Sequence, residues 1–480
     1  MFVKIYPIKK ISNVMATKKI RIEKDSLGEV KVPKDALWGA QTQRAVNNFP
    51  ISGIKMDFPF TKSFVSTLGI IKDAAARANL RLKLLPAKKA KAISKAAKEV
   101  WQEKHHKEFP IDVFQTGSGT SSNMNANEVI ANLASKYAKT PVSPNDDVNM
   151  SQSSNDVIPT AIKVSAHMDL TKKLYPALDN LINEIEKKAK SVEGLVKTGR
   201  THLMDAMPID LSDELRAWTS QLGASRNMLG IIEQRFLELP QGGTAVGSGI
   251  NAHKQFAKYF AQEMTKLSGN KCVPSENFFH ELSAQDCSVQ LSGELKNLAV
   301  ILMKISNDLR WMNSGPLAGF SEIELQALQP GSSIMPGKVN PVIPEAVTMA
   351  SADVIGNDVT ITIAAQAGNF QLNVMLPVIA YNLLKSINLL AGAMNVLSAK
   401  GVKTFKVNKK NIVESLSMNP ILVTALNPII GYEKAAEIAK KAYKEGRPII
   451  DVAVEETDLS ESRLKKLLDP SKLTKGGISK

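Results

Sequence analysis

A polar segment in the second half of the chain gathers groups that could bind a small anion. It reads Gly331-Ser-Ser-Ile-Met-Pro-Gly-Lys-Val-Asn-Pro341, and two glycines and two prolines within eleven residues predict a loop of defined shape. Its serines, lysine and asparagine offer several hydrogen-bond donors and one positive charge. A Walker phosphate loop is excluded, because five residues separate Gly331 from the Gly-Lys pair and Val339 follows the lysine. A flexible linker is the alternative, although it has no need for these polar residues.

A second polar segment, residues 115–125, sets a Gly-x-Gly sequence among hydroxyl and amide side chains before a helix predicted at 124–137. The amino terminus of a helix presents N–H groups without partners and a partial positive charge, so this segment predicts a carboxylate cradle. It is not a dinucleotide fingerprint, because Ser122 occupies the position of the third glycine. The alternative is an ordinary serine-rich helix cap.

A third segment reads Ser151-Gln-Ser-Ser-Asn-Asp-Val-Ile-Pro-Thr160. Asn155 or Asp156 can cap a helix whose first turn tolerates Pro159, and the apolar periodicity extends this helix to about residue 190, with a bend at Pro176. Helix capping explains one or two of these polar residues but not the whole run, which indicates a binding role.

The fourth segment is Gly199-Arg-Thr-His-Leu-Met-Asp-Ala206. Histidine as a residue type suits proton transfer near neutral pH, so His202 is a candidate for that role, although a lone histidine is more often a structural hydrogen-bonding residue. All four segments are expected at the ends of predicted helices.

These segments match patterns of the fumarase/aspartase superfamily: G-S-S-x-M-P-x-K-x-N-P, T-G-S-G-T-x-S-N-M-N, S-Q-S-S-N-D and G-R-T-H-L-x-D-A. The chain resembles class II fumarases from about Arg21 to near Gly477. The resemblance implies a lyase, fumarate hydratase, that hydrates fumarate reversibly and stereospecifically to L-malate in the tricarboxylic acid cycle, with no metal and no cofactor. Aspartate ammonia-lyase is the alternative. Aspartases usually have Gln in place of His202, whereas residues 341–345 look somewhat like the aspartase version.

The resemblance also implies roles for individual residues. Ser332 would be the base that takes the carbon-bound proton, while His202, acting through a water and paired with Glu345, would serve the hydroxyl side. A serine is a poor base unless its oxyanion is stabilised, so loop N–H groups and Lys338 would have to lower its pKa. Substrate binding is implied for Ser118, Gly119, Thr120, Ser153, Ser154, Asn155, Thr201, Ser333, Lys338, Val339 and Asn340.

A second anion site is a further feature of this resemblance, and the chain departs from it. Fumarases often carry an Arg and a His before P-N-D-D, whereas Thr140 and Ser143 stand at these places here. The residues of this chain that correspond to the second anion site are Ser143, Pro144, Asn145 and Asp146.

Composition narrows the class of protein. No apolar run approaches 18 residues, so no transmembrane helix or membrane partner is expected. Two cysteines without metal-ligand spacing favour a reducing compartment and argue against a structural metal site. The net charge of +15 is spread along amphipathic segments in a chain with only 5% aromatic residues. This pattern is typical of a solvated surface that attracts acidic substrates, so no nucleic-acid partner is predicted.

The elements that must position these segments are mostly helices. Long apolar helices are predicted at about 275–313 and 374–399, and such wide apolar faces indicate a helix bundle shared between subunits. The resemblance implies a mainly α, three-domain fold whose central bundle forms a homotetrameric core, with active sites shared between subunits, in the cytoplasm. The predicted division is an N-terminal extension at 1–20, expected to be disordered, a mixed, mostly helical domain at 21–152, the bundle at 153–403 and a small helical domain at 404–480.

The first 22 residues contain lysines and an arginine but no acidic residue. Two interpretations stay open from the residues alone: an organelle transit peptide, or a true start at Met15.

Overall fold

The computed structural model describes residues 19–56 and 60–477. The described chain divides into two compact units. The first contains the described residues up to Ser165 together with Phe236–Gln285 and Ile363–Tyr381, and the second contains Ala166–Arg235, Asp286–Thr362 and the chain from Asn382 onwards. The predicted N-terminal extension lies almost wholly outside the described residues, and the four-part division remains a prediction.

Helices make up most of the described chain, and the strands are short. The strands are β1 (Ile20–Asp25), β2 (Gly28–Pro33), β3 (Val196–Thr201), β4 (Met204–Asp210), β5 (Glu238–Leu239), β6 (Val273–Pro274), β7 (Ile323–Glu324), β8 (Gly368–Asn369), β9 (Leu372–Asn373) and β10 (Lys406–Val407). The α-helices are α1 (Ala40–Asn48), α2 (Lys62–Arg81), α3 (Ala87–Trp101), α4 (Thr120–Ala138), α5 (Ser154–Asp169), α6 (Tyr175–Ser191), α7 (Leu211–Glu233), α8 (Phe256–Ser268), α9 (Phe278–Ser283), α10 (Asp286–Met312), α11 (Val342–Ala365), α12 (Leu376–Val396), α13 (Lys409–Ser417), α14 (Asn427–Ile430), α15 (Tyr432–Glu445), α16 (Ile449–Glu456), α17 (Glu461–Leu467) and α18 (Pro470–Leu473). Short 3-10 or π-helical turns are η1 (His106–Glu108), η2 (Pro144–Val148), η3 (Leu170–Leu174), η4 (Gln234–Leu237), η5 (Leu397–Val402) and η6 (Pro420–Leu426).

Helix α2 is the centre of the first unit. Most of its side chains are buried, and it packs against α3, α4 and α8. Small residues permit this close packing: a Cβ added at Gly69 would lie 2.8 Å from the backbone nitrogen of Trp101 in α3. The strands β1 and β2 form an antiparallel hairpin in register from Ile20 opposite Pro33 to Asp25 opposite Gly28.

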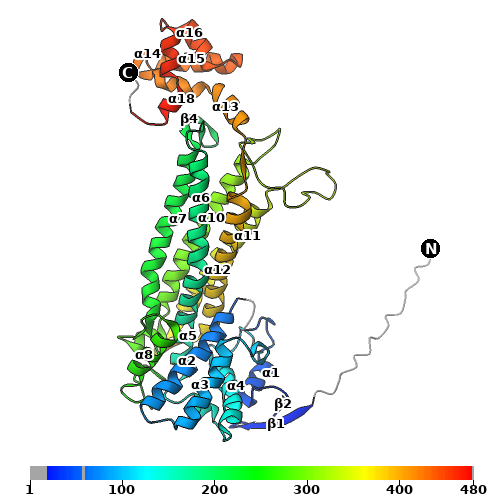
Figure 1. Cartoon of the computed structure of the whole chain (residues 1–480), viewed down its shortest axis with the longest axis vertical. Coiled ribbons are helices and arrows are strands. Elements are labelled where there is room, and N and C mark those ends of the chain that lie inside the picture. The colour runs from blue at the N-terminus through cyan, green and yellow to red at the C-terminus, as the bar shows by residue number, and fades with distance from the viewer. Residues whose placement is uncertain (1–18, 57–59, 478–480) are drawn as a thin grey trace, which may run out of the picture. The chain divides into compact units, whose positions relative to one another are not determined.

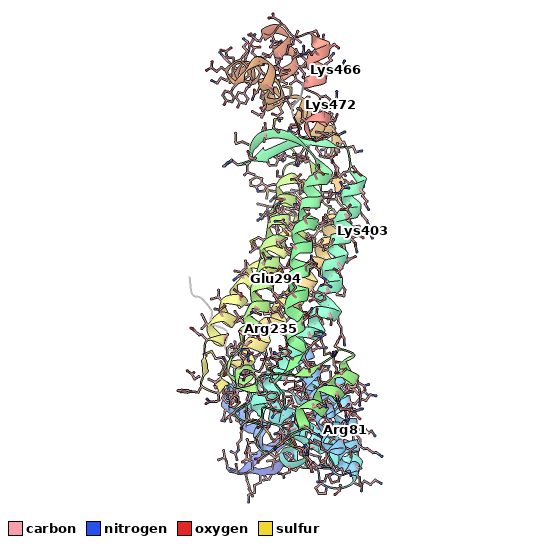
Figure 2. All side chains as sticks on the ribbon, turned by 90° about the vertical axis from the view of Figure 1, so that its left-hand side faces the viewer. Arg81, Arg235, Glu294, Lys403, Lys466 and Lys472 are labelled. Atoms are coloured by element: carbon pink, nitrogen blue, oxygen red, sulfur yellow. The ribbon has the colours of Figure 1, made fainter. Side chains whose placement is uncertain are left out.

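Long helices form a bundle in the second unit, where α6, α7 and α10 run alongside one another (Figure 1). Apolar side chains fill its interior, and Trp218 of α7 is completely buried. A few buried polar contacts set the register between helices. One is a 2.6 Å hydrogen bond from Ser225 of α7 to Glu294 of α10, the residue labelled in Figure 2. Another is the 2.8 Å hydrogen bond from Ser292 of α10 to Asp358 of α11.

The helices near the carboxyl end have their own apolar cluster. Ala435, Ile438 and Ala442 share one buried face of α15, as helical spacing requires, and they pack with Val452 and Leu464. This cluster brings α13 to α18 together as a small helical assembly within the second unit.

The mainly helical fold is confirmed, but one long helix is interrupted. The single helix predicted at 275–313 is instead α9 followed by α10. Asn277 caps α9 through its side chain, and Ala284 leaves the helix with an extended ψ of 149° before α10 begins at Asp286. Apolar periodicity continues through the break, so the sequence pattern did not reveal it.

One segment, Leu376–Val402, is long and apolar enough by composition to cross a membrane, which a count of uninterrupted apolar residues did not indicate. However, 67% of its most apolar window is buried within the protein. Burial of this extent is typical of a core helix.

Candidate functional site

The first predicted motif lies in the first unit, where it forms a turn and the start of α4. This helix begins at Thr120, four residues before the predicted start, and the turn ahead of it is tightly constrained. Gly119 has a positive φ of 72°, and a Cβ there would lie 2.8 Å from Ile158. At Gly117 a Cβ would lie 1.7 Å from the carbonyl oxygen of Val374, so no side chain fits.

Hydroxyl groups dominate this turn. Ser118 and Thr120 share a 2.8 Å hydrogen bond. The N–H groups of Ser121 and Ser122 donate to the side chains of Thr116 and Gln115, so these two helix donors already have partners. The carboxylate cradle predicted here therefore depends on the Ser118 and Thr120 hydroxyls more than on the helix amino terminus.

The second motif also lies in the first unit, where it caps α5. The cap residue is Ser153, not Asn155 or Asp156 as predicted: Ser153 Oγ accepts the N–H of Asn155, and Asp156 Oδ1 accepts the N–H of Ser153. This reciprocal pair is similar to a capping box, with Asp156 in place of the usual Glu or Gln and with the Ser153 oxygen bound to the second N–H of the helix. Because the helix begins at Ser154, ahead of both predicted caps, Pro159 lies in its second turn instead of its first. Between α5 and α6 lies the π-helical turn η3, and Pro176, where a bend was predicted, is the second residue of α6.

A segment that begins with the Gly242-Gly243 pair supports the second motif. Asp156 Oδ2 accepts N–H groups of Gly242 at 3.0 Å and Thr244 at 2.9 Å, and the Asn155 amide donates to the carbonyl of Ala245 at 2.8 Å. Burial raises the pKa of Asp156 to about 6, while its backbone hydrogen bonds act in the opposite direction. The only sequence signal for this role was the Gly242-Gly243 pair.

The third motif lies in the second unit, at the tip of a β-hairpin and not at a helix end as predicted. Antiparallel strands β3 and β4 are joined by His202 and Leu203, with φ values of 56° and 61°. Two positive φ values in succession define a type I′ turn, which favours Asn and Gly over a residue as bulky as leucine. Gly199 is required in the hairpin, because a Cβ there would lie 2.6 Å from the Met207 carbonyl. The imidazole of His202 is exposed at this tip.

A buried ion network anchors the base of this hairpin. The Nζ of Lys197 lies 2.7 Å from Glu322 and 2.9 Å from Glu214. The guanidinium of Arg200 pairs with the same Glu322 carboxylate and lies 4.1 Å from the centroid of the Phe320 ring. The Lys197 and Glu322 side chains are only 1% and 7% exposed. The strand that leads to His202 is therefore attached to the segment after α10.

The loop predicted at residues 331–341 lies in the second unit, and hydrogen bonds close it into a ring. Gly331 N–H donates to the Lys338 carbonyl at 2.8 Å, and the Asn340 amide donates to the Gly331 carbonyl at 2.7 Å. A Cβ at Gly331 would lie 2.5 Å from the Lys338 carbonyl oxygen, and Gly337 has a φ of 82°. The loop therefore has the defined shape predicted for it, and α11 starts directly after it at Val342.

Inside this ring, Ser332 accepts two backbone hydrogen bonds. Its Oγ receives the N–H groups of Ile334 at 3.2 Å and Met335 at 3.0 Å. Both donors would stabilise negative charge on this oxygen, which is the requirement stated for a serine base.

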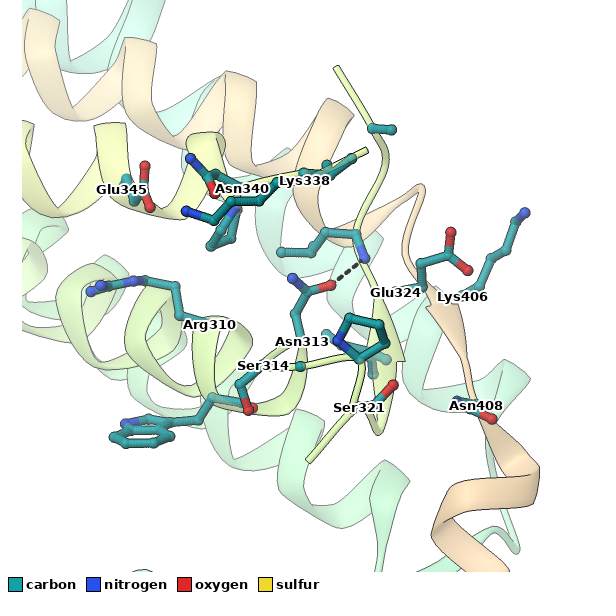
Figure 3. Close-up of a pocket in the computed structure, with 18 of the residues that line it drawn as sticks. Arg310, Asn313, Ser314, Ser321, Glu324, Lys338, Asn340, Glu345, Lys406 and Asn408 are labelled. Carbon is teal, nitrogen blue, oxygen red and sulfur yellow. Dashed lines mark hydrogen bonds between the residues drawn. The ribbon is translucent and has the colours of Figure 1, made fainter. Parts of the chain in front are cut away.

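A cavity of about 1050 Å³ lies beside the loop (Figure 3). Lys338, Asn340 and Glu345 line one side of it, with Arg310 and Asn313 on the other. Val339 lines this cavity and, with Ser332, a smaller one of about 450 Å³, while Thr201 lines a third of about 470 Å³. Ser333 is exposed on the loop.

The contacts between the predicted site residues and the units to which they belong are as follows. Among the described residues, no hydrogen bond or ion pair joins His202 to Glu345 or Lys338 to Ser332. The first and second motifs belong to one unit, and the third motif and the loop belong to the other. Within the described ranges, no group of three His, Cys, Asp or Glu side chains could hold a metal ion.

The residues predicted for a second anion site form the start of a π-helical turn, η2, which Ser143 caps. Ser143 Oγ accepts a hydrogen bond from the N–H of Asp146 at 3.0 Å and donates one to the Asp146 carboxylate at 2.9 Å. Pro144 and Asn145 line a cavity of about 640 Å³ together with Arg21. The guanidinium of Arg21 donates to the backbone carbonyls of residues 33, 34, 36 and 38, so it is already occupied.

Two protein-family models match this chain, one over most of its length and one near its carboxyl end. The family described as "Lyase" matches residues 28–356, and "Fumarase C C-terminus" matches residues 422–475. The chain is 58% identical over 458 residues to class II fumarate hydratase 2 of Pseudomonas aeruginosa, covering 95% of this chain and 99% of that relative. It is 48% identical to the class II fumarate hydratase of Bacillus subtilis, covering 95% and 99%.

Solved structures agree with this relationship. The class II fumarase from Schistosoma mansoni superposes with a TM-score of 0.91 at 36% identity, covering 95% of this chain and 99% of that one. A fumarate lyase:delta crystallin from Brucella melitensis, solved bound to cobalt, has the same TM-score of 0.91 at 42% identity, covering 95% and 100%. The sequence-based resemblance is confirmed: the chain belongs to the class II fumarate hydratase family.

Proposed function

We propose that the protein catalyses the reversible hydration of fumarate to L-malate. The observation that carries the proposal is the environment of Ser332, whose Oγ accepts two N–H groups within a closed loop. In the dehydration of L-malate to fumarate, a proton leaves the carbon next to a carboxylate and hydroxide leaves the neighbouring carbon. Loss of the proton creates a doubly negative aci-carboxylate, which is accessible only if donors are already in position to meet it.

Ser332 is the proposed base for this carbon-bound proton. Its two N–H donors lower the cost of forming an oxyanion, and Lys338, on the same ring, adds a positive charge near the loop. The proposed hydrogen-bond donors to the substrate from this loop are Lys338, Asn340 and Ser333. Val339 is proposed to contact the substrate as well.

His202 is the proposed proton carrier on the hydroxyl side, acting through a water and paired with Glu345. Support comes from its position on a constrained turn, because positive-φ residues are often found at functional sites. Thr201, directly before it, is a proposed donor to a substrate carboxylate.

The hydroxyl-rich motifs of the first unit are the proposed remainder of the substrate site. Ser118, Gly119 and Thr120 form one cluster, and Ser153, Ser154 and Asn155 form the other. Short hydroxyl and amide side chains on constrained backbone suit a dicarboxylate, since they donate hydrogen bonds without adding a permanent charge.

The proposal includes a homotetramer with active sites shared between subunits. Support comes from α11, where Ala346, Met349, Ala352, Gly356 and Val359 are exposed at helical spacing. Met349 is 68% exposed and Val359 is 55% exposed, which is unusual for large apolar side chains unless another surface covers them. We also propose that the enzyme works in the cytoplasm, and the buried cysteines Cys272 and Cys287, neither of which forms a disulfide, fit a reducing compartment.

The test is the ultraviolet absorbance of fumarate formed by the purified protein from L-malate, with L-aspartate as a parallel substrate. We expect fumarate from L-malate alone. Fumarate from L-aspartate alone would replace the proposal with aspartate ammonia-lyase chemistry, and no product from either substrate would refute both activities.

A further inference from the structure

A lysine that no motif includes is completely buried in the first unit. Lys72 lies on α2 with no exposed surface. Its Nζ contacts three side-chain oxygens: Asn123 at 2.7 Å, Gln152 at 2.9 Å and Asn149 at 3.0 Å. An ammonium group has three N–H donors, so these acceptors satisfy it fully. Within the described part of the chain, no carboxylate forms an ion pair with it.

Two of the three acceptors of Lys72 belong to the hydroxyl-rich motifs, and the third, Asn149, lies two residues before the second motif. Asn123 lies in the first turn of α4, three residues after Thr120. Asn149 and Gln152 lie in the segment that leads to the α5 cap. A single buried cation on α2 therefore ties together both parts of the binding surface proposed for this unit.

The direction of the hydrogen bonds follows from the chemistry of lysine. Because an ammonium group only donates, the Asn123 side chain must turn its oxygen towards Lys72. Its amide nitrogen then faces Ser154 and donates to Ser154 Oγ at 2.9 Å. Since Oγ accepts this bond, the hydroxyl proton of Ser154 remains available for another acceptor.

We infer that Lys72 and Asn123 are positioning residues that make Ser154 a hydrogen-bond donor to a carboxylate of the substrate. This inference rests on the proposed function. Without Lys72, the Asn123 amide could rotate and present its oxygen to Ser154. The Ser154 proton would then point at Asn123, and an oxygen lone pair would face the substrate carboxylate.

The charge of Lys72 acts in the same direction as its geometry. An ammonium group in a dry interior is poorly screened, so its field favours an anion nearby. Burial lowers the pKa of Lys72 to about 7, and the negative charge of Asp156 opposes that shift. The ammonium form that orients Asn123 therefore prevails below this pH, and the kinetics that follow are measured at about pH 6.

The experiment is a double-mutant cycle between Asn123→Ala and Ser154→Ala, measured by steady-state kinetics with L-malate and fumarate. Each single variant should raise KM about tenfold, the effect of one hydrogen bond to a charged group, while kcat stays within about twofold. Asn123→Ala should add less than about twofold in the Ser154→Ala background, because its effect acts through that hydroxyl.

Asn127→Ala is the matched control. Asn127 is a second buried amide, one turn further along α4, which donates to Asn149 at 3.1 Å in the same cluster. It does not contact Ser154, so its loss should leave KM within about twofold. An equal rise in KM for Asn127→Ala would mean that any damage to the cluster disturbs the site, which would overturn the inference.

A further variant, Lys72→Met, should reproduce the KM rise of Asn123→Ala if it folds, as judged by circular dichroism. If Lys72→Met does not fold, the double-mutant cycle between Asn123→Ala and Ser154→Ala tests the positioning role by itself. Independent, multiplicative effects of Asn123→Ala and Ser154→Ala would refute the positioning role while leaving the proposed function intact. A wild-type protein that forms no fumarate from L-malate would refute the proposed function and, with it, this inference.

Discussion

The Ser332 hydroxyl is a weak acid, and it can act as a base only if its deprotonated oxygen is stabilised. Serine ordinarily holds its proton far above neutral pH, and two loop N–H groups that already point at Oγ lower the cost of losing it. The ring closed by Gly331 and Asn340 keeps these donors in place before any substrate arrives. Preorganised donors of this kind are more effective than donors that must first reorient.

Ser332→Ala should therefore lower kcat about 10³-fold for both directions of the reaction, because it removes the group that takes the proton. The thermal unfolding temperature should remain unchanged, since Ser332 is not buried in an apolar core. The neighbouring exposed hydroxyl offers a control: Ser333→Ala should reduce kcat/KM much less. A Ser332→Ala enzyme with near-normal turnover would remove the assigned base.

His202→Asn tests the proton carrier while keeping the turn, because asparagine accepts the positive φ of 56° better than most residues. We expect kcat to fall about 10²- to 10⁴-fold with little change in stability. A His202→Asn enzyme with near-normal turnover would show that another group carries this proton.

The motifs were readable from the sequence because each is a continuous string of a few residues. Lys72 was not readable, because its three partners lie 51, 77 and 80 residues away in the chain. A lysine within the apolar α2 sequence was the only available signal, and a solvated lysine at the edge of a helix would produce the same local pattern.

At the level of elements, the hairpin of β3 and β4 was the main feature that the sequence did not predict. Its turn contains His202 and Leu203 instead of the Asn-Gly or Asp-Gly pairs that usually mark such hairpins. Long-range ion pairs compensate for this unfavourable turn, and they involve Glu322, more than 120 residues away in sequence. Helices α2 to α7 follow apolar periodicity more closely, which is why helix was the easier element to predict.

Glu322→Gln should destabilise the protein by about 3 kcal/mol, because it removes the shared partner of Lys197 and Arg200 in a buried site. The same variant should lower kcat more than it raises KM, since the His202 turn loses its anchor. Glu461→Gln removes an exposed ion pair with Lys465 and should change nothing measurable. Equal effects of the two variants in urea denaturation would contradict the anchoring role.

At the scale of the whole molecule, stability should depend on pH through Lys72. Its pKa in the folded protein is about 7, against an ordinary value of 10.5. Between these values the unfolded chain holds a proton that the folded chain does not, so the free energy of unfolding should rise with pH across this window. Lys72→Met should flatten that rise in urea denaturation between pH 7.5 and about 9.5, whereas the exposed Lys465→Met should not. Parallel curves for wild type and Lys72→Met would mean that Lys72 keeps its proton.

Assembly is the second property at this scale. Light scattering should give about four times the 52.2 kDa mass of one chain. Met349→Asp places a charge on the exposed apolar face of α11 and should reduce both the assembly and the turnover. Met418→Asp changes an exposed methionine near the carboxyl-terminal helices and should leave both unaltered. An active, fully assembled Met349→Asp protein would show that this face is not an interface.

The missing side chain at Gly117 has a consequence for genetics. Even one methyl group would lie 1.7 Å from the Val374 carbonyl oxygen, so every replacement must displace the backbone between the first motif and the start of α12. A random-mutagenesis screen for lost growth would therefore recover Gly117 as readily as Ser332. Lesions at the two positions would be separable by protein abundance, since one allele yields a misfolded chain and the other a folded but inert one.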